Sequence, residues 1–258
     1  YGEDPYLTTR MGLAVVNGLQ GQSFDGKPLA APGVPASDQS KAPQYVKTLA
    51  CAKHFAVHSG PEWNRHVFNL ENLPARDLWE TYLPAFKSLV QDGHVAEVMC
   101  AYQRIDGAPC CSNAKLERQI LRAAWGFKGS ITSDCGAVND LYMPGYHGTA
   151  KTATEATAQA VNAGTDLECG SAYRTIPKAV KAGMINEDKV NQSLKRLLVA
   201  RFKLGDFDKD ETVAWTQIPE NVIACKAHKD LAEKIAEEGI VLLQNRNQLL
   251  PLNRNQKI

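Results

Sequence analysis

The stretch GSITSDCGA at residues 129–137 indicates the fold class, because a short apolar run ends there in a carboxylate and then in small residues. Similar short runs lie at residues 48–53, 96–102 and 165–169. Longer stretches with helical spacing of apolar residues separate these runs. Short buried strands that alternate with amphipathic helices predict a parallel sheet with helices outside it.

The expected helices lie at residues 6–19, 74–91, 113–125, 153–163, 173–182 and 188–204, and residues 21–43 are expected to form a surface loop. Four strand–helix units fit either the second half of a (β/α)8 barrel or half of an open doubly wound sheet. No G-x-G-x-x-G follows any of the strands, so nothing in the sequence supports a dinucleotide-binding fold.

The sequence predicts three parts along the chain. Residues 1–204 carry the strand–helix units, and polar residues 205–220 form a linker. Residues 221–258 begin a second domain, with a helix at 221–238 and a strand at 239–244. The chain begins without Met, in residues typical of the middle of a protein, so we expect it to be a fragment.

Charge and hydropathy exclude two classes of partner. The 258 residues include 29 Lys and Arg against 28 Asp and Glu, a net charge of +1, which disfavours nucleic acid. No apolar run approaches the roughly 18 residues of a membrane span. The seven cysteines include no C-x-x-C pair, and the simplest expectation is that most are buried free thiols.

Polar side chains follow all four predicted strands, at the ends where working residues of parallel α/β folds lie. These residues are Lys53, His54, Tyr102, Arg104, Asp134 and Glu168. Such side chains at four equivalent positions predict a functional cleft more readily than a structural role. Asp134 is the strongest candidate, and the alternative is an Asp that caps a helix. For Lys53, the alternative is a structural role in which it only neutralises a neighbouring carboxylate.

Histidines raise a second hypothesis, a metal site. The loop from His54 to His66 holds His54, His58 and His66, but it contains no H-E-x-x-H motif, so we predict no metal. His147 lies on the loop after Asp134, where a solvent-facing imidazole is the expected case.

Residues 53–55, 99–102, 129–136 and 164–170 resemble the catalytic barrel of glycoside hydrolase family 3. Residues 1–7 resemble the segment after that family's fourth barrel strand, and residues 239–252 resemble the start of its second domain. The resemblance covers nearly the whole chain in order. It implies an α/β fold: a partial (β/α)8 TIM barrel with about strands five to eight, a linker, and the first elements of an α/β sandwich.

The resemblance also implies roles for individual residues. Asp134 matches the catalytic nucleophile, Lys53 and His54 match the sugar-binding pair, and Tyr102 matches the tyrosine beside the nucleophile. Many β-glucosidases of the family have Trp where this chain has Cys135, which favours the β-xylosidase branch. The KHFAVH sequence at residues 53–58 differs from the N-acetylglucosaminidase motif. The acid/base Glu is expected beyond Ile258.

The implied activity is retaining, exo-acting hydrolysis of terminal non-reducing β-D-xylosyl or β-D-glucosyl residues of oligosaccharides or aryl β-glycosides, with no cofactor. A non-catalytic sugar-binding relative, an inert fragment, and a metal-dependent hydrolase that uses the His54–His66 loop are the alternatives. A periplasmic or extracellular location is expected. Cys135 and Cys169 follow neighbouring strands roughly 4.8 Å apart, so they could form a disulfide, and two free thiols are the alternative.

Overall fold

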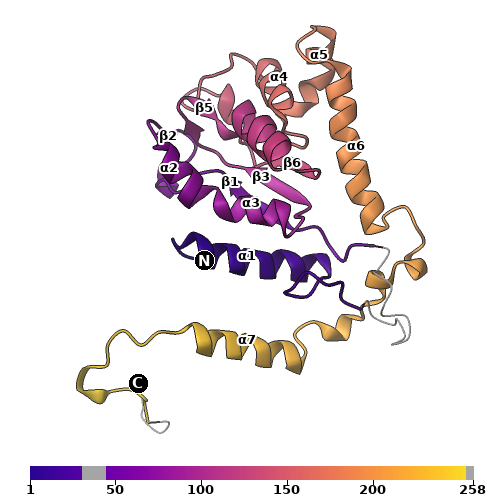
Figure 1. The fold of residues 1–258 in the computed structure, drawn as a ribbon. Helices are drawn as coiled ribbons and strands as arrows, with labels where there is room; N and C mark the ends of the chain where they lie inside the picture. The colour runs from indigo at the N-terminus through magenta and orange to yellow at the C-terminus, as the bar shows by residue number, and fades with distance from the viewer. Residues whose placement is uncertain (31–44, 254–258) are drawn as a thin grey trace. The chain divides into compact units, whose positions relative to one another are not determined.

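Figure 1 shows the protein as a computed structural model, which describes residues 1–30 and 45–253. The chain divides into two compact units, residues 1–216 and residues 217–258. Residues 31–43 of the predicted surface loop lie outside the described residues. Residues 21–30 of that loop contain one isolated antiparallel bridge, between Gln22 and Pro28.

The first unit is an α/β structure built on a parallel sheet. Strands β1 (Cys51–Phe55), β3 (Glu97–Cys100) and β6 (Ser130–Ser133) pair in the order β1-β3-β6. Each lies within or next to a run that the sequence predicts as a strand. Parallel neighbours put all three carboxyl ends at one edge of the sheet. Lys53 and His54 lie near the end of β1, Tyr102 follows β3 and Asp134 follows β6.

The predicted fourth strand at residues 165–169 is wrong in extent. The segment makes a single parallel bridge, from Leu167 to Thr132 of β6. The backbone N–H groups of both Asp166 and Leu167 donate to the carbonyl of Ile131, at 2.8 and 3.1 Å. Two successive donors to one carbonyl interrupt the alternation that a ladder needs, so no regular strand develops.

A second small sheet lies beyond these strand ends. Strand β2 (Asn69–Leu70) pairs parallel with β4 (Arg104–Ile105), which pairs antiparallel with β5 (Ala108–Pro109). The sequence does not predict this sheet, because two-residue strands are too short to show a period of two.

Up to residue 204, helical segments form at each of the six predicted stretches, and further short helical turns form between them. In chain order they are α1 (Pro5–Gln20), η2 (Glu62–Asn64), α2 (Ala75–Asp77), η3 (Leu78–Tyr82), α3 (Pro84–Gln91), η4 (Cys110–Ser112), η5 (Lys115–Ala124), η6 (Asn139–Leu141), α4 (Ala153–Ala163), η7 (Ala172–Thr175), α5 (Ile176–Lys181) and α6 (Glu187–Leu204). Helix α1 begins where the Asp4 carboxylate accepts the Tyr6 N–H at 2.9 Å, and it ends at Gly21, whose φ of 84° favours glycine.

The main core lies between the sheet and the helices beside it. Helix α3 packs on β1, and α1 packs on α3. The Phe55 ring contacts Phe86 and Trp125, with ring centroids 5.1 and 5.9 Å apart. Gly129, just before β6, lies so close to the segment before β3 that a Cβ there would collide with the Ala96 carbonyl. This close approach explains the glycine at the start of the strand.

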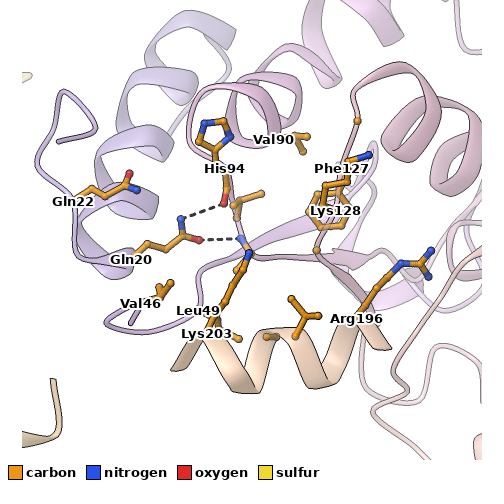
Figure 2. Close-up of a pocket in the computed structure, with 16 residues that line it drawn as sticks. Gln20, Gln22, Val46, Leu49, Val90, His94, Phe127, Lys128, Arg196 and Lys203 are labelled. Atoms are coloured by element: carbon orange, nitrogen blue, oxygen red, sulfur yellow. Dashed lines mark hydrogen bonds between the residues drawn. The ribbon is translucent and has the colours of Figure 1, made fainter. Parts of the chain in front are cut away.

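A pocket of about 370 Å³ opens at the amino ends of the strands, and Figure 2 shows its lining. Gln20 links α1 to the wall of this pocket. Its amide oxygen accepts the Ala96 N–H at 2.9 Å, and its amide nitrogen donates to the Gly93 carbonyl at 3.2 Å. The amide nitrogen also donates to the His94 carbonyl at 3.3 Å (Figure 2). Asp134 follows the carboxyl end of β6, so this pocket is not the candidate active site.

The predicted linker region holds short turns, η8 (Asp210–Thr212), η9 (Ala214–Gln217) and η10 (Glu220–Val222), and the second unit has one longer helix, α7 (Lys226–Gly239), followed by η11 (Arg246–Gln248). The strand predicted at residues 239–244 does not form. Apolar Ile240 and Leu243 are exposed there, because the described part of this unit offers no strand for them to pair with. Among the described residues, no helix is long and apolar enough to cross a membrane.

Candidate active site

Asp134 lies at the end of β6, whose four residues are all buried. Its carboxylate uses both oxygens in hydrogen bonds. The Cys135 N–H donates to Oδ1 at 2.7 Å, and Nε2 of His54 lies 3.0 Å from Oδ2. The side chain is only 13% exposed, so these contacts hold the carboxylate in a largely enclosed position.

His54 comes to Asp134 from β1, two strands away in the sheet order. Burial lowers the pKa of His54 below its usual 6.5, and the opposing charge of Asp134 acts in the other direction. A neutral imidazole with its proton on Nε2 can donate that proton to the carboxylate. His54 therefore orients the Asp134 carboxylate.

Lys53 precedes His54 but faces different surroundings. Its side chain is exposed and lines a cavity of about 590 Å³ with Tyr82 and Phe86, while its charge acts to lower the pKa of His54. The structure brings His54, rather than Lys53, into contact with Asp134.

Tyr102 completes the immediate surroundings of the carboxylate. Its hydroxyl donates to the Cys135 carbonyl at 2.8 Å. Burial, followed by the charge and hydrogen bonding of Asp134, raises the pKa of Tyr102 to about 12. The phenol therefore stays protonated and serves as a donor beside the carboxylate.

Arg65 and His66 lie against the Tyr102 ring, although the sequence indicated only a histidine-rich loop here. The Arg65 Cζ is 4.9 Å from the ring centroid, and the His66 centroid is 4.3 Å from it. His66 also contacts Asp140, a residue that no motif in the sequence indicates. Contacts between residues 74 positions apart leave no local signal, so only the fold reveals them.

Two of the predicted site residues have other contacts in the structure. Arg104 lies on β4, where its Nη2 donates to the Val67 carbonyl at 3.0 Å. The Glu168 carboxylate accepts the N–H groups of Ala172 and Tyr173 at 2.9 and 2.8 Å, which caps η7. Substrate binding by Arg104 and Glu168 stays a prediction.

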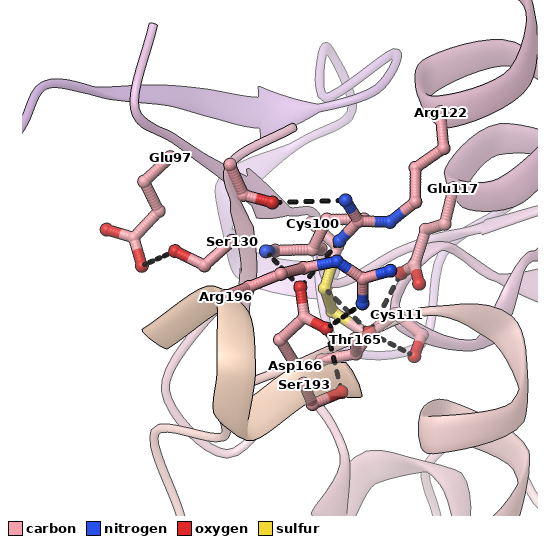
Figure 3. Close-up of polar contacts among 12 residues, drawn as sticks. Glu97, Cys100, Cys111, Glu117, Arg122, Ser130, Thr165, Asp166, Ser193 and Arg196 are labelled. Carbon is pink, nitrogen blue, oxygen red and sulfur yellow. Dashed lines mark hydrogen bonds and ion pairs between the residues drawn. A yellow bond between two sulfur atoms is a disulfide. The ribbon is translucent and has the colours of Figure 1, made fainter. Parts of the chain in front are cut away.

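Asp166 is a further carboxylate beside β6, and Figure 3 shows its contacts with Arg122, Arg196 and Ser193. Its oxygens lie 2.5 Å from Arg122 Nη2 and 2.7 Å from Arg196 Nη1, and they accept the Ile131 N–H at 2.9 Å and the Ser193 hydroxyl at 2.7 Å. The side chain is fully buried. Asp166 therefore joins η5, β6 and α6, and it is not free to attack a substrate.

Two disulfides lie in the first unit. One joins Cys135 and Cys169, with Cα atoms 4.5 Å apart, directly beside Asp134. The other joins Cys100 and Cys111, with Cα atoms 5.1 Å apart, in the buried core (Figure 3). The expectation that most cysteines are free thiols is therefore wrong, because four of the seven are in disulfides. The turn η4 brings Cys111 back to Cys100 at the end of β3, and the segment after Leu167 brings Cys169 to Cys135.

The histidines do not assemble a metal site. In the part of the chain that the structure describes, no three His, Cys, Asp or Glu side chains are placed to hold an ion. His58 contacts the Gln103 amide oxygen at 3.1 Å, and His66 is paired with Asp140. His147 is buried rather than solvent-facing, because its Nε2 lies 2.8 Å from the Tyr102 carbonyl in the interior of the loop.

Comparison with known proteins accords with this geometry. Residues 1–200 match the model of the glycosyl hydrolase family 3 N-terminal domain. A xylan 1,4-β-xylosidase of Xylanibacter ruminicola is 48% identical over 99% of this chain. The chain spans 28% of that relative's length.

Solved structures show the same likeness. A β-glucosidase of Erythrobacter marinus matches with a TM-score of 0.78 and 31% identity, over 98% of this chain and 31% of the other. A family 3 exo-β-xylosidase in complex with a xylobiose aziridine probe matches with a TM-score of 0.76 and 26% identity, over 98% and 37%. The chain, with Asp134 at the carboxyl end of β6, belongs to glycoside hydrolase family 3.

Proposed function

We propose that the full-length protein is a retaining, exo-acting β-glycosidase that releases terminal non-reducing β-D-xylosyl residues, with β-D-glucosyl residues as the second candidate. The observation that carries the proposal is the Asp134 carboxylate, held by His54 and the Cys135 N–H at a strand end. The xylan 1,4-β-xylosidase at 48% identity supports the reaction class.

Asp134 is proposed as the nucleophile. Its carboxylate attacks the anomeric carbon, the glycosidic C–O bond breaks, and a glycosyl ester forms. A second carboxyl group protonates the departing oxygen and then takes a proton from the water that hydrolyses the ester. In retaining enzymes the two carboxyl groups lie roughly 5–5.5 Å apart. We place this second group outside residues 1–258, as the family resemblance implies.

The Cys135–Cys169 bridge supports a preference for xylose over glucose. The bridge lies directly beside Asp134 and restrains the loop that carries it, and we infer that it narrows the sugar site there. Xylose lacks the hydroxymethyl group that glucose carries on C5, so a narrowed site accommodates it more readily. A pocket that has no room for that group discriminates by steric exclusion.

The β1-β3-β6 order and the bridge to Leu167 support the assignment of this chain to about strands five to eight of a (β/α)8 barrel. Two disulfides support a periplasmic or extracellular location, because such bonds persist in oxidising compartments.

The test uses the full-length protein and aryl β-xyloside and β-glucoside substrates. We expect higher kcat/KM on the xyloside, and covalent labelling of Asp134 by a 2-fluoro-xyloside, located by peptide mapping. Asp134→Ala should lower kcat by several orders of magnitude, whereas Asp92→Asn, an exposed carboxylate next to α3, should change nothing. Labelling at Asp166 or Glu168 would overturn the assignment of the nucleophile.

A further inference from the structure

Asp140 and His66 form a contact that joins two loops of the site. Asp140 lies on η6, just after the nucleophile loop, and His66 lies on the loop after β1. His66 Nδ1 is 2.7 Å from Asp140 Oδ2. The Asp140 side chain is 6% exposed, and its backbone is held as well: its N–H donates to the Gly136 carbonyl at 3.1 Å, and its carbonyl accepts the His147 N–H at 2.9 Å.

This contact fixes which nitrogen of His66 carries a proton. An ionised carboxylate only accepts, so Nδ1 is the donor to Asp140. Nε2 of the neutral ring is then an acceptor, and Arg65 Nε donates to it at 3.3 Å. The carboxylate of Glu62 holds the other end of the Arg65 guanidinium. Asp140 thus orients His66, which in turn orients Arg65.

Both oriented side chains pack against Tyr102. The His66 ring lies 4.3 Å from the Tyr102 ring centroid, and the Arg65 guanidinium lies 4.9 Å from it. The Tyr102 hydroxyl donates to the carbonyl of Cys135, the residue directly after Asp134. The polar chain therefore runs from a buried carboxylate to the backbone that presents the nucleophile.

We propose that His66 and Asp140 are a positioning pair that fixes Arg65 and Tyr102 beside the Asp134 carboxylate. The inference rests on the proposed function, because it assigns the pair a part in the attack by Asp134. Neither residue touches the carboxylate. Their effect passes through Tyr102, whose position sets the geometry in which Asp134 meets the anomeric carbon.

The test is the rate of glycosyl-enzyme formation, measured in the full-length enzyme as the burst of phenolate from a dinitrophenyl β-xyloside. His66→Phe keeps a ring against Tyr102 but loses both hydrogen bonds of the imidazole, and it should slow this step by at least about tenfold, the size of one lost hydrogen bond. His66→Gln supplies both a donor and an acceptor and should stay within about threefold of the wild type. Asp140→Asn keeps an acceptor oxygen and should also stay within about threefold.

Two controls make the result specific. Glu80→Gln breaks an exposed ion pair with Arg76 and should leave the burst unchanged. The melting temperature of each variant is measured alongside, because a purely structural role would lower it while the burst rate of the folded enzyme stays the same. An active wild type with a normal burst in His66→Phe would overturn the positioning pair alone. A wild type that is inactive on every aryl β-glycoside would overturn the proposed function, and the pair with it.

Discussion

His147 is a buried imidazole that should make the folded protein sensitive to acid. Burial lowers its pKa from 6.5 to about 4. As the pH falls below 6.5, His147 binds a proton in the unfolded chain but not in the folded chain until about pH 4. The free energy of unfolding therefore falls over this interval. The loss approaches about 3 kcal/mol at the lower end.

The substitution His147→Gln tests this effect, since its amide can still donate to the Tyr102 carbonyl. We expect the apparent melting temperature to fall less between pH 6.5 and pH 4 in this variant than in the wild type. His228→Gln, an exposed histidine of α7, is the control and should keep the wild-type slope. The same slope in both variants would show that another group titrates.

His54 and Lys53 should both contribute to turnover, although they face different surroundings. Replacement of either with Ala is expected to cost about 1.5–3 kcal/mol of transition-state stabilisation, the range for hydrogen bonds to charged groups. The measurement is kcat/KM on an aryl β-xyloside, with the exposed Lys87→Ala on α3 as the control. Wild-type kcat/KM in both variants would make the pair structural.

Individual site residues differ in how well a sequence predicts them. Asp134 and His54 directly follow or end buried runs, and the strand ends bring them together. Arg65 lies in a loop and Asp140 on the three-residue turn η6, and neither segment has a periodicity, so their roles depend on contacts made only after folding. Glu168 lies where the sequence expects it, but its two oxygens cap a helix, a role that the residue type alone does not distinguish from sugar binding.

At the scale of the elements, we expect the two disulfides to differ in their effects: both stabilise the fold, but only one affects substrate preference. Chain-entropy arguments give about 4 kcal/mol for a bridge that spans 34 residues, as between Cys135 and Cys169, and about 3 kcal/mol for one that spans 11, as between Cys100 and Cys111. The first bridge braces the loop beside Asp134, whereas the second is buried in the core.

We therefore expect serine substitution of both Cys135 and Cys169 to lower kcat/KM on the xyloside, and to lower it less on the glucoside, as the rim opens. The matched variant with serine at 100 and 111 should melt earlier but keep the ratio between the two substrates. Melting curves and kcat/KM on both substrates decide the matter. If the ratio of kcat/KM on the xyloside to that on the glucoside is the same in the two variants, the Cys135–Cys169 bridge does not set the substrate preference.

The elements that the sequence predicts well are those with a clear burial period. Helix α4 coincides with its prediction, because its amphipathic stretch is long, and β3 and β6 lie inside theirs, because neighbouring strands are present to pair with their buried runs. The predicted strand at residues 239–244 fails for the opposite reason. Apolar composition suits a strand, but a strand exists only where another strand hydrogen-bonds to it.

At the scale of the whole molecule, residues 1–258 by themselves should have no glycosidase activity. In the described residues β1 pairs only with β3, and α1 exposes Met11, Val15 and Leu19. An unpaired strand edge and uncovered apolar side chains favour aggregation. The proposed proton donor, worth about 10²–10⁴-fold in rate, also lies elsewhere.

The measurement is expression of residues 1–258 and assay of the purified chain with aryl β-xyloside and β-glucoside, together with light scattering. Asp134→Ala in the same chain is the control for contaminating activity. Turnover by the purified chain that Asp134→Ala abolishes would contradict the expectation.

The hydrogen bonds of Gln20 can form only after later parts of the chain have been synthesised. Gln20 is synthesised 73 residues before its partner Gly93. A ribosome that adds about 5–20 residues per second takes roughly 4–15 s to cover that distance. Until then α1 has neither the turn before β3 nor helix α3 to dock on. During each round of translation the apolar face of α1 is therefore open to chaperones and to neighbouring nascent chains for seconds.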